Sequence, residues 1–582
     1  MDPNRYYRYD IQGLRAIAVV SVIVFHSGFL PNGYLGVDVF LVISGFLITK
    51  IIYDNFKQDK YSIKVFYERR FRRIIPLVLL TGMVALVLGL IFMLPDDLEN
   101  LSQSIIATNF FSNNILQYMT TRDYWDVGND YKPMLHTWSL GIEEQFYLAF
   151  PFLFVILKSN KKYIFSTLLV ITVISFLYFI FNSNQAFKFY MLPTRFFEIS
   201  IGGLAALKMD KIIGNRWISG LSFFMLIFIL VVELQLPNEL EVIIVVICSV
   251  LLIAFNHPSS FVNKVLKNKM MVYIGAISFS LYMWHQVILA FFRYTITQKI
   301  GIVNFMLILG TTFLLSIISY HGVERYFRSK QNVSINTLLK FCVALFALIN
   351  ITCFVIYLKA GIIRDVPELG ITTKDTKRGI HAKYNARIYD MDRNFKDTGK
   401  TKVLIIGHSF ARDFANIILE SRYADGVEIS YSADPYKSKN MQAKTSKADI
   451  IFLSEYDKQS FISLKSQFNI DARKVWVIGT KRFGSNNGVV YNNRSPDYCN
   501  QRVEVDNQTL ILNKQLANEW GSRYINLLSS ILDNNGKVAV FTSDCKFISQ
   551  DTRHLTRSGA KMFAGLLNLE KYLKVPHVIS AP

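Results

Sequence analysis

Side chains of the kinds that do acid–base chemistry lie inside long apolar stretches of the first 360 residues. Charged groups in such surroundings are costly and usually mark a functional site. The set comprises Arg15, His26, Glu143, Arg195, Glu198, Tyr282 and His285. We expect His26 to act as a general base or as a covalent carrier of a transferred group, because imidazole titrates near neutral pH. Glu143 could orient that ring, Arg15 could stabilise developing negative charge, and Tyr282 and His285 could close the pocket.

Two further charge patterns each have a structural alternative. Arg69, Arg70, Arg72 and Arg73 stand where a basic connector leads into the third apolar stretch. Guanidinium groups suit bidentate contacts with phosphate, but Arg and Lys are also the usual anchors at cytoplasmic helix ends. Arg195 and Glu198 lie three residues apart on one helix face, so a local ion pair is the alternative to a ligand-binding role for that arginine.

A separate chemical signal lies in the last 180 residues. Ser409 directly follows the apolar run 403–407 and precedes a helical pattern, which places its hydroxyl at a strand-to-helix turn beside a helix N-terminus. Asp551 and His554 are three residues apart and could approach that serine together, with His554 as base and Asp551 as its orienter. A Gly-x-Ser turn alone is usually a helix cap, so the Asp-x-x-His pair carries the argument.

The composition shows which elements must hold these groups. Of 582 residues, 51% are hydrophobic and 18% charged, and the mean hydropathy is +0.27, which excludes disordered and collagen-like chains. The pattern predicts a multi-pass α-helical membrane bundle followed by a soluble α/β domain. Eleven stretches are long enough to cross a bilayer. They are 11–29, 34–53, 74–94, 137–157, 163–181, 193–208, 217–235, 240–256, 271–293, 301–322 and 336–358, of which the sixth and eleventh are the weakest predictions.

The net charge of +21 arises from 64 Lys and Arg against 43 Asp and Glu. Basic residues cluster in every second connector, which favours a cytoplasmic N-terminus and, with eleven spans, an extracytoplasmic tail. This clustering argues against nucleic-acid binding. The five cysteines show no metal-ligand spacing. We therefore expect a membrane domain over 1–330, an additional transmembrane helix over 331–360, a linker or added lobe over 361–400 and an α/β domain over 401–582; the oligomeric state is not indicated.

The tail alternates short apolar runs with helical patterns, which is typical of a parallel sheet covered by helices. The strand-like runs are 403–407, 450–453, 475–479 and 538–541, and helical patterns occupy 412–421 and 507–518. The tail also contains Cys499 and Cys545. In an oxidising compartment two otherwise unpaired cysteines of one domain should bond, so we expect a disulfide between them.

Six segments resemble, in family order, the acyltransferase-3 membrane family, with Arg15 and His26 at its Arg-x10-His signature. They are 9–49, 68–76, 136–148, 192–203, 277–286 and 323–328. The resemblance implies transfer of an acyl group, usually acetyl, from cytoplasmic acyl-CoA to extracytoplasmic carbohydrate. It implies acetyl-CoA as the donor, no metal, and a cationic cradle for the phosphates of coenzyme A. Arg70 and Arg73 match the family pattern of that cradle, and Arg195, Tyr282 and His285 are further candidates for binding the donor.

Gly-x-Ser at Ser409 and Asp551-x-x-His554-Leu resemble the first and fifth sequence blocks of SGNH-type esterase domains. The resemblance implies an SGNH-hydrolase-like fold over about 400–570. His408 stands where that family usually has Asp, and Ser454-Glu455-Tyr456 replaces its Gly-x-Asn-Asp block. The asparagine that donates to the oxyanion is therefore missing, and Gly479 or another backbone N–H could replace it.

These features favour a membrane O-acetyltransferase that modifies a cell-surface polysaccharide, such as the O-antigen of lipopolysaccharide, in a bacterial inner membrane. Its expected partners are the lipid bilayer, acyl-CoA and a surface glycan acceptor, with no nucleic acid. A polytopic transporter or exporter with a sugar-binding tail would explain the intramembrane charges but not the Ser409 and Asp551-x-x-His554 pairing. A membrane-anchored carbohydrate esterase would explain the tail but not the arginine cluster.

Overall fold

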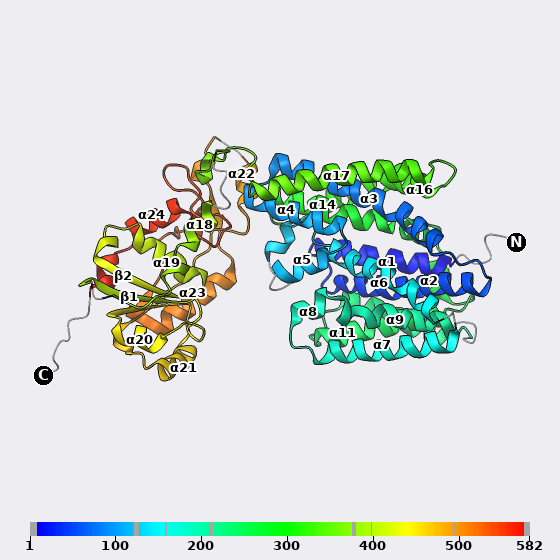
Figure 1. The fold of residues 1–582 in the computed structure, drawn as a ribbon, viewed down its shortest axis with the longest axis horizontal. Helices are drawn as coiled ribbons and strands as arrows, with labels where there is room; N and C mark the ends of the chain where they lie inside the picture. Colours follow the sequence, from blue (N-terminus) through cyan, green and yellow to red (C-terminus); the bar gives the residue numbers. More distant parts are fainter. Residues whose placement is uncertain are drawn as a thin grey trace. The chain divides into compact units, whose positions relative to one another are not determined.

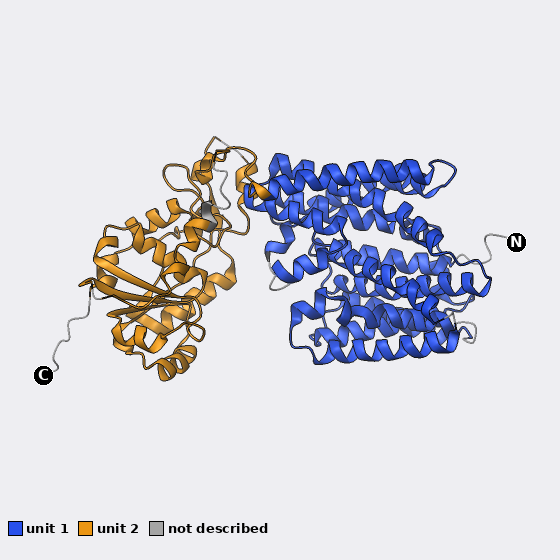
Figure 2. Cartoon of the chain, viewed as in Figure 1, with its two compact units in different colours: residues 1–357 blue, residues 358–582 orange. Residues whose placement is uncertain are grey.

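The computed structural model describes residues 8–120, 127–157, 160–208, 213–374, 380–396, 398–493 and 496–574. Its contacts divide the chain into two compact units, residues 1–357 and 358–582 (Figure 2). The first unit is helical and the second is α/β with a parallel sheet, which confirms the predicted fold class (Figure 1).

The first unit is built from helices that run back and forth beside one another (Figure 1). They are α1 (Tyr9–His26), α2 (Gly36–Lys57), α3 (Ile63–Phe92), α4 (Pro95–Asn109), α5 (Asn113–Thr120), α6 (Thr137–Ile156), α7 (Lys161–Phe181), α8 (Gln185–Tyr190), α9 (Leu192–Lys208), α10 (Arg216–Val231), α11 (Asn238–Phe255), α12 (Phe261–Leu266), α13 (Lys269–Ala276), α14 (Ser278–Thr295), α15 (Ile302–Ser319), α16 (Arg325–Arg328) and α17 (Ile335–Leu358).

Fewer of these helices are long and apolar enough to cross a membrane than the eleven predicted. Eight pass by length and composition, and the bent pair α13–α14 would make nine, counted over the described ranges. The sixth predicted span corresponds to α9, which has 17 residues and carries Arg195 and Glu198. At 1.5 Å per residue α9 is about 25 Å long, shorter than the roughly 30 Å apolar core of a bilayer. Charge and length together explain why this helix does not qualify.

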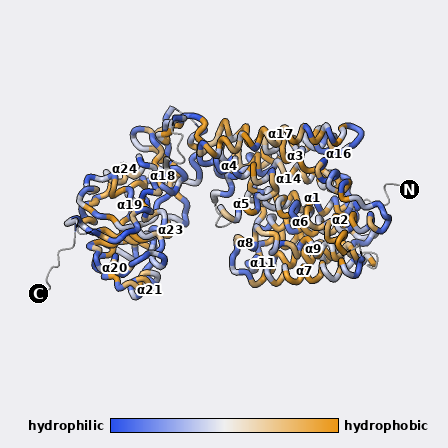
Figure 3. The backbone as a smooth tube through the Cα atoms, in the orientation of Figure 1, coloured by the Kyte–Doolittle hydropathy of each residue, from blue (hydrophilic) through white to orange (hydrophobic). Residues whose placement is uncertain are grey.

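Peripheral helices of the first unit expose apolar side chains to their surroundings. Val170, Ile174 and Phe181 on α7 and Leu348 and Ile351 on α17 are all exposed. Figure 3 shows hydrophobic residues along both helices. A large exposed apolar surface of this kind is stable when it contacts lipid and not water. The first unit is therefore a membrane bundle.

Close glycine contacts fix the position of α1, the helix that carries Arg15 and His26. A Cβ atom on Gly13 would lie 2.1 Å from the Leu266 carbonyl oxygen, and one on Gly275 of α13 would lie 1.8 Å from the Gln12 carbonyl oxygen. Helices in membranes approach this closely where residues lack side chains. The contact packs α1 against α12 and α13, next to the α14 segment that carries Tyr282 and His285.

The second unit contains a five-stranded parallel sheet in the order β2-β1-β3-β4-β6 and a two-stranded antiparallel sheet of β5 and β7. The strands are β1 (Thr401–Ile406), β2 (Val427–Ser432), β3 (Ile450–Ser454), β4 (Val475–Ile478), β5 (Arg502–Glu504), β6 (Tyr524–Ile525) and β7 (Lys537–Ala539). The helices are α18 (Ile380–Ala386), α19 (Ser409–Leu419), α20 (Met441–Lys447), α21 (Lys458–Phe468), α22 (Asn487–Asn492), α23 (Asn507–Trp520), α24 (Arg557–Leu566) and α25 (Leu569–Leu573).

Two apolar cores lie on opposite faces of the parallel sheet. Val403 and Ile405 of β1 belong to one core, and Leu404 and Ile406 belong to the other. Side chains alternate between the faces of a strand, so a continuous apolar run indicates a strand buried on both sides. The runs at 403–407, 450–453 and 475–479 are strands of this sheet, as predicted. The run at 538–541 instead joins the antiparallel pair, and β2 and β6 were not predicted.

The predicted disulfide between Cys499 and Cys545 is present, and Cys248, Cys342 and Cys353 are free and buried. The bond closes a loop across a sequence separation of 46 residues. On the chain-entropy model such a crosslink stabilises the folded state by roughly 3–4 kcal/mol.

We expect the bond to persist in the intact protein. Thiol labelling of the denatured, unreduced protein should modify three cysteines, and labelling after reduction should modify all five. The double variant Cys499→Ser/Cys545→Ser should make the second unit more sensitive to limited proteolysis, because the unfolded chain regains its loop entropy. Labelling of Cys499 or Cys545 without reductant would contradict the bond.

Candidate active site

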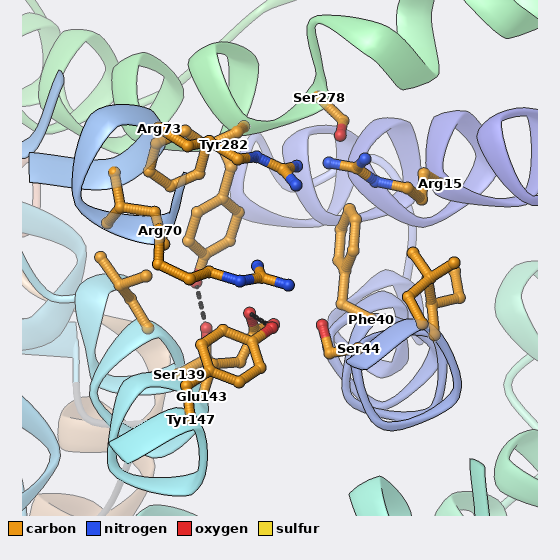
Figure 4. Close-up of a pocket in the computed structure, with 15 residues that line it drawn as sticks. Arg15, Phe40, Ser44, Arg70, Arg73, Ser139, Glu143, Tyr147, Ser278 and Tyr282 are labelled. Atoms are coloured by element: carbon orange, nitrogen blue, oxygen red, sulfur yellow. Dashed lines mark hydrogen bonds between the residues drawn. The ribbon is translucent and has the colours of Figure 1, made fainter. Parts of the chain in front are cut away.

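Five helices of the membrane unit enclose a cavity that holds about 770 Å³ of empty space, part of it open to the surroundings. Its lining combines apolar side chains with a few polar and charged ones, which is typical of small-molecule and cofactor sites. Figure 4 shows its polar lining, with Arg15 from α1, Ser44 from α2, Arg70 and Arg73 from α3, Ser139, Glu143 and Tyr147 from α6, and Ser278 and Tyr282 from α14.

The guanidinium groups of Arg15, Arg70 and Arg73 point into the same space (Figure 4). None of the three makes an ion pair with a carboxylate among the residues that the structure describes. Arg70 stacks on the ring of Tyr147, 4.5 Å from its centroid, and Arg15 lies 3.5 Å from the side-chain oxygen of Gln12. Arg15 is buried and Arg70 and Arg73 are half-buried, and cations shielded from water without a bonded carboxylate are costly. The cavity is therefore suited to an anionic ligand.

Arg72 and Arg69 play different parts from their neighbours. Arg72 is buried, forms an ion pair with Glu68 at 3.0 Å, and donates to the carbonyl oxygens of Phe327 and Val333. It ties α3 to the segment that joins α16 and α17. Arg69 is exposed. The arginine run thus divides into Arg70 and Arg73, which line the cavity, and two residues that do not.

Glu143 lines the cavity and accepts a hydrogen bond from the Tyr147 hydroxyl at 2.9 Å. Tyr282 lines it from the opposite helix, and its hydroxyl lies 2.8 Å from the Ser139 hydroxyl (Figure 4). Glu143 was expected to orient His26, but no hydrogen bond joins these two residues in the described structure. Its neighbours are the arginines and Tyr147.

His26 lies at the end of α1, eleven residues beyond Arg15. At 1.5 Å per residue the two are about 16 Å apart along the helix axis. Its ring contacts that of His285, whose Nε2 atom is 3.1 Å from His26 Nδ1. The ring of His136 packs edge-on against His285, with centroids 5.1 Å apart. Arg293 donates to the His26 carbonyl oxygen at 2.8 Å. The structure thus gathers three imidazoles at the end of the helix away from Arg15.

Arg195 does not line the arginine cavity. It forms ion pairs with Asp38 at 2.6 Å and Glu198 at 2.8 Å, and all three side chains are buried. It instead borders a second cavity with Tyr34, Lys188 and Glu239. The pairing with Glu198 considered from the sequence is present, and the unforeseen partner Asp38 comes from α2.

In the second unit, Ser409 is the first residue of α19 and directly follows the turn after β1. Gly407 in that turn has φ +132°, and a Cβ atom there would lie 2.9 Å from the Ser454 side chain. Tyr431 of β2 holds the turn by donating to the Gly407 carbonyl oxygen at 2.9 Å. In the sheet order observed here, β1 and β3 flank the point where the connections reverse, which is where open α/β sheets bind ligands.

Asp551 and His554 form the expected pair, with His554 Nδ1 2.6 Å from Asp551 Oδ2. The Asp551 carboxylate is partly exposed, but its desolvation by the surrounding protein raises its pKa. Hydrogen bonds from the His554 ring and from the backbone N–H groups of Arg553 and His554 outweigh this desolvation and lower this pKa to about 2. Asp551 thus stays ionised over the physiological range and holds Nδ1 of His554 in its protonated form.

A buried ion pair connects the His554 loop to the serine helix. Asp413 of α19 accepts a hydrogen bond from the Leu555 N–H at 2.9 Å, and Lys481 Nζ lies 2.8 Å from its carboxylate. No hydrogen bond joins Ser409 to His554 in the described residues. Catalytic hydrogen bonds are often long in ligand-free structures and tighten when substrate binds. The Gly479 N–H donates to the Ile525 carbonyl oxygen, so it is not available to an oxyanion.

Several residues of these sites were missed from the sequence. His136, Asp413 and Lys481 were not singled out, although His136 opens a segment that was. Asp413 lies one helical turn after Ser409, and Lys481 follows the fourth strand by three residues. Position after a parallel strand is the signal that could have identified Lys481, since such residues gather at one edge of the sheet.

The fold and cavities define a polytopic membrane protein with an arginine-lined cavity, joined to an α/β domain. Residues 8–321 match the acyltransferase-3 family model, which describes an acyltransferase domain. The chain belongs to this family. It is similar to O-acetyltransferase OatA of Staphylococcus aureus strain NCTC 8325 / PS 47, with 33% identity over 352 residues, covering 56% of this chain and 58% of the relative. OatA of strain COL matches with the same identity and coverage.

The chain thus spans less than two thirds of the length of the curated relatives it matches. No solved structure matches it.

The Asp551–His554 pair predicts a specific acid sensitivity. The pKa of Asp551 is lower in the folded protein, about 2, than its ordinary value of 3.8. Its stabilising effect should therefore be complete above the ordinary value and disappear as pH falls through the folded value. Peptic digestion of the second unit should be faster for Asp551→Asn than for wild type near pH 4, and the difference should vanish near pH 2. Asp425→Asn, at an exposed aspartate, is the control. A difference that persists unchanged at the lowest pH would contradict this assignment.

Proposed function

We propose that the protein is a membrane O-acetyltransferase that moves acetyl from cytoplasmic acetyl-CoA to a hydroxyl of a cell-surface polysaccharide. The observation that carries this proposal is the convergence of Arg15, Arg70 and Arg73 on one intramembrane cavity, where no described carboxylate forms an ion pair with them. Family membership supports acyl transfer, and the similarity to OatA favours a hydroxyl acceptor.

The shape of the donor agrees with the spacing of the two polar groups on α1. Acyl-CoA carries its phosphates at one end of a long flexible arm and its thioester at the other. Phosphate near Arg70 and Arg73 would leave the arm free to extend along α1 toward His26, about 16 Å beyond Arg15. Arg15 lines the same cavity as Arg70 and Arg73, so its charge adds to the phosphate-binding end of the site. His26 then acts as general base or acyl carrier.

In this proposal the second unit completes the transfer as an SGNH-like domain. Ser409 receives the acetyl group and passes it to a sugar hydroxyl, with His554 as base and Asp551 as its orienter. The position of Ser409 at the reversal point of a parallel sheet supports this role. The Cys499–Cys545 disulfide favours an oxidising, extracytoplasmic compartment for this unit. The N-terminus is then cytoplasmic and the membrane is the bacterial inner membrane.

The acceptor class is a surface polysaccharide, with the O-antigen of lipopolysaccharide as the specific candidate. Inverted membrane vesicles that enclose purified glycan and are supplied from outside with acetyl-labelled acetyl-CoA test this directly. Label should appear in the glycan as an alkali-labile ester. A transporter with a sugar-binding tail would leave the label on coenzyme A, and a carbohydrate esterase would release acetate from pre-acetylated glycan. O-antigen and peptidoglycan strands, compared side by side, identify the acceptor.

Arg70 and Arg73 should contribute to donor affinity while Arg69 should not. Each charge-assisted contact with phosphate is worth about 1.5–3 kcal/mol, so Arg70→Gln or Arg73→Gln should weaken acetyl-CoA binding roughly tenfold to a hundredfold. Arg69→Gln removes the same charge from an exposed position in the same segment and should leave affinity unchanged. Equilibrium binding of labelled acetyl-CoA to the purified protein measures this. Equal losses of acetyl-CoA affinity in all three variants would show that the arginine cluster acts only as a general membrane anchor.

Ser409→Ala should stop glycan acetylation and spare donor binding. Loss of a nucleophile that acts as a unit with its base costs about 10³-fold or more in its own step. Ser446→Ala, at an exposed serine of α20, is the matched control. Acetylated glycan is measured in cells and acetyl-CoA affinity on the purified protein. Glycan acetylation near the wild-type level in Ser409→Ala would show that the membrane unit acetylates the sugar itself.

A further inference from the structure

The loop that carries Asp551 and His554 has a strained backbone. Thr552, between these two residues, is buried and has a φ angle of +73°. A β-branched residue rarely adopts this left-handed conformation, so the structure around the loop must hold it there. The position of the His554 ring therefore depends on contacts from outside its own loop.

The segment that follows β4 holds the first part of this loop. The Phe483 N–H donates to the Thr552 carbonyl oxygen at 2.9 Å. The Asn487 side chain donates to the carbonyl oxygens of Ser549 and Gln550 at 2.8 and 3.0 Å. These bonds fix the path of the backbone as far as Thr552. Neither contact reaches the end of the loop.

A buried ion pair holds the end of the loop. The N–H of Leu555, the residue after His554, donates to Asp413 Oδ2 at 2.9 Å. Lys481 Nζ lies 2.8 Å from the same oxygen, and both charged side chains are at most 1% exposed. Asp413 belongs to α19, the helix that begins at Ser409. One carboxylate therefore joins the helix of the candidate nucleophile to the loop of its candidate base.

Lys481 offsets the cost of burying this carboxylate. Its Nζ atom also lies 3.6 Å from the centroid of the Phe410 ring, and half-buried Arg412 lies 3.3 Å from the other oxygen of Asp413. Removing one charge of a buried pair leaves the other uncompensated, whereas replacing both by neutral groups is often tolerated. The ion pair and the hydrogen bond to Leu555 can therefore be separated by substitution.

We propose that Asp413 is a positioning residue of the second unit, whose hydrogen bond to the Leu555 N–H sets the His554 ring relative to Ser409. Lys481 compensates the charge of that carboxylate inside the domain. This inference rests on the proposed function, in which Ser409 receives the acetyl group. It goes further by naming the contact that sets the distance between the nucleophile and its base.

Two double variants separate the hydrogen bond from the charges. Asp413→Asn/Lys481→Met is neutral at both positions and keeps a side-chain oxygen that accepts from Leu555. Asp413→Leu/Lys481→Met is also neutral but has no acceptor. Turnover of p-nitrophenyl acetate by the purified full chain measures the step at Ser409. We expect kcat within about tenfold of wild type for the Asn variant and a fall of about a hundredfold for the Leu variant, because a misplacement of about 1 Å costs roughly 10²-fold.

KM for the ester should stay near wild type in both double variants, because the Asp413 bond positions the base and does not bind the ester. Equal kcat values for the two double variants would overturn the proposal, and so would an effect confined to KM. If the Leu variant does not fold, Asp413→Ala/Lys481→Met, which also lacks the acceptor and has a smaller side chain, replaces it.

A buried lysine elsewhere in the same unit gives a matched control. Lys444 of α20 is buried and forms an ion pair with Asp392. Met441 of α20 and Phe414 of α19 belong to different cores, so the two helices pack on opposite faces of the sheet. Lys444→Met should lower the stability of the unit and leave kcat for the ester near wild type. A hundredfold fall of kcat in this control would assign the effect to stability and overturn the proposal.

A second measurement does not depend on activity. Amide hydrogen exchange over residues 551–556, followed by mass spectrometry, reports whether the end of the loop is held. We expect slow exchange in wild type and in the Asn double variant, and faster exchange in the Leu double variant. Equally slow exchange in the Leu variant would overturn the proposal. If wild-type protein does not turn over the ester, the proposed function of Ser409 fails, while the exchange result still decides whether Asp413 holds the loop.

Discussion

The cost of positive charge inside an apolar bundle governs the architecture of the membrane unit. Arg15, Arg70 and Arg73 come from two helices and meet at one cavity without an ion-paired carboxylate in the described structure. Glu143 lies near them but is bonded to Tyr147. An isolated guanidinium loses several kcal/mol on leaving water. The arrangement is stable only because water or an anion can enter the cavity, so stability and ligand binding depend on the same opening. Arg195, with two carboxylates at bonding distance, shows how the same bundle compensates an arginine by ion pairing.

The second constraint is the placement of α1. Its close contact at Gly13 and Gly275 leaves no room to slide or rotate, so the depths of Arg15 and His26 are set by helical rise alone. Any larger residue at either glycine would move both groups together. The spacing of eleven residues therefore sets the distance between the cationic region and the imidazoles, which is about 16 Å along the helix axis. In the proposed function that distance matches a donor whose charged and reactive ends are far apart.

Local patterns in the sequence predicted most helices and strands, whereas the side-chain pairs that form the candidate sites depend on tertiary contacts. The apolar blocks predicted a membrane bundle, and continuous apolar runs predicted β1, β3 and β4, because each signal is local. The sequence left open which arginines of the run 69–73 line a site and which are structural. Arg70 and Arg73 lie three residues apart on one helix face, whereas Arg72 donates to the carbonyl oxygens of residues more than 250 positions away. The same applies to His26 with His285 and to Asp413 with Lys481, which only the folded chain brings together. Eleven predicted spans compare with at most nine by length and composition among the described residues, because α9 and α10 have only 17 and 16 residues and hydropathy does not reveal where a helix ends. The strand β2 was missed because Glu428 and two serines interrupt its apolar pattern.

The two candidate sites hold a histidine in different surroundings. In the second unit the Asp551 carboxylate is 42% exposed, so water shares the cost of its charge while it bonds His554. In the membrane unit the ring of His26 contacts the buried ring of His285, which is itself bonded to the Tyr282 carbonyl oxygen. These two contacts add no charge beside the cavity that Arg15, Arg70 and Arg73 line. The positive field of the three arginines therefore remains available to the anion that it is proposed to bind.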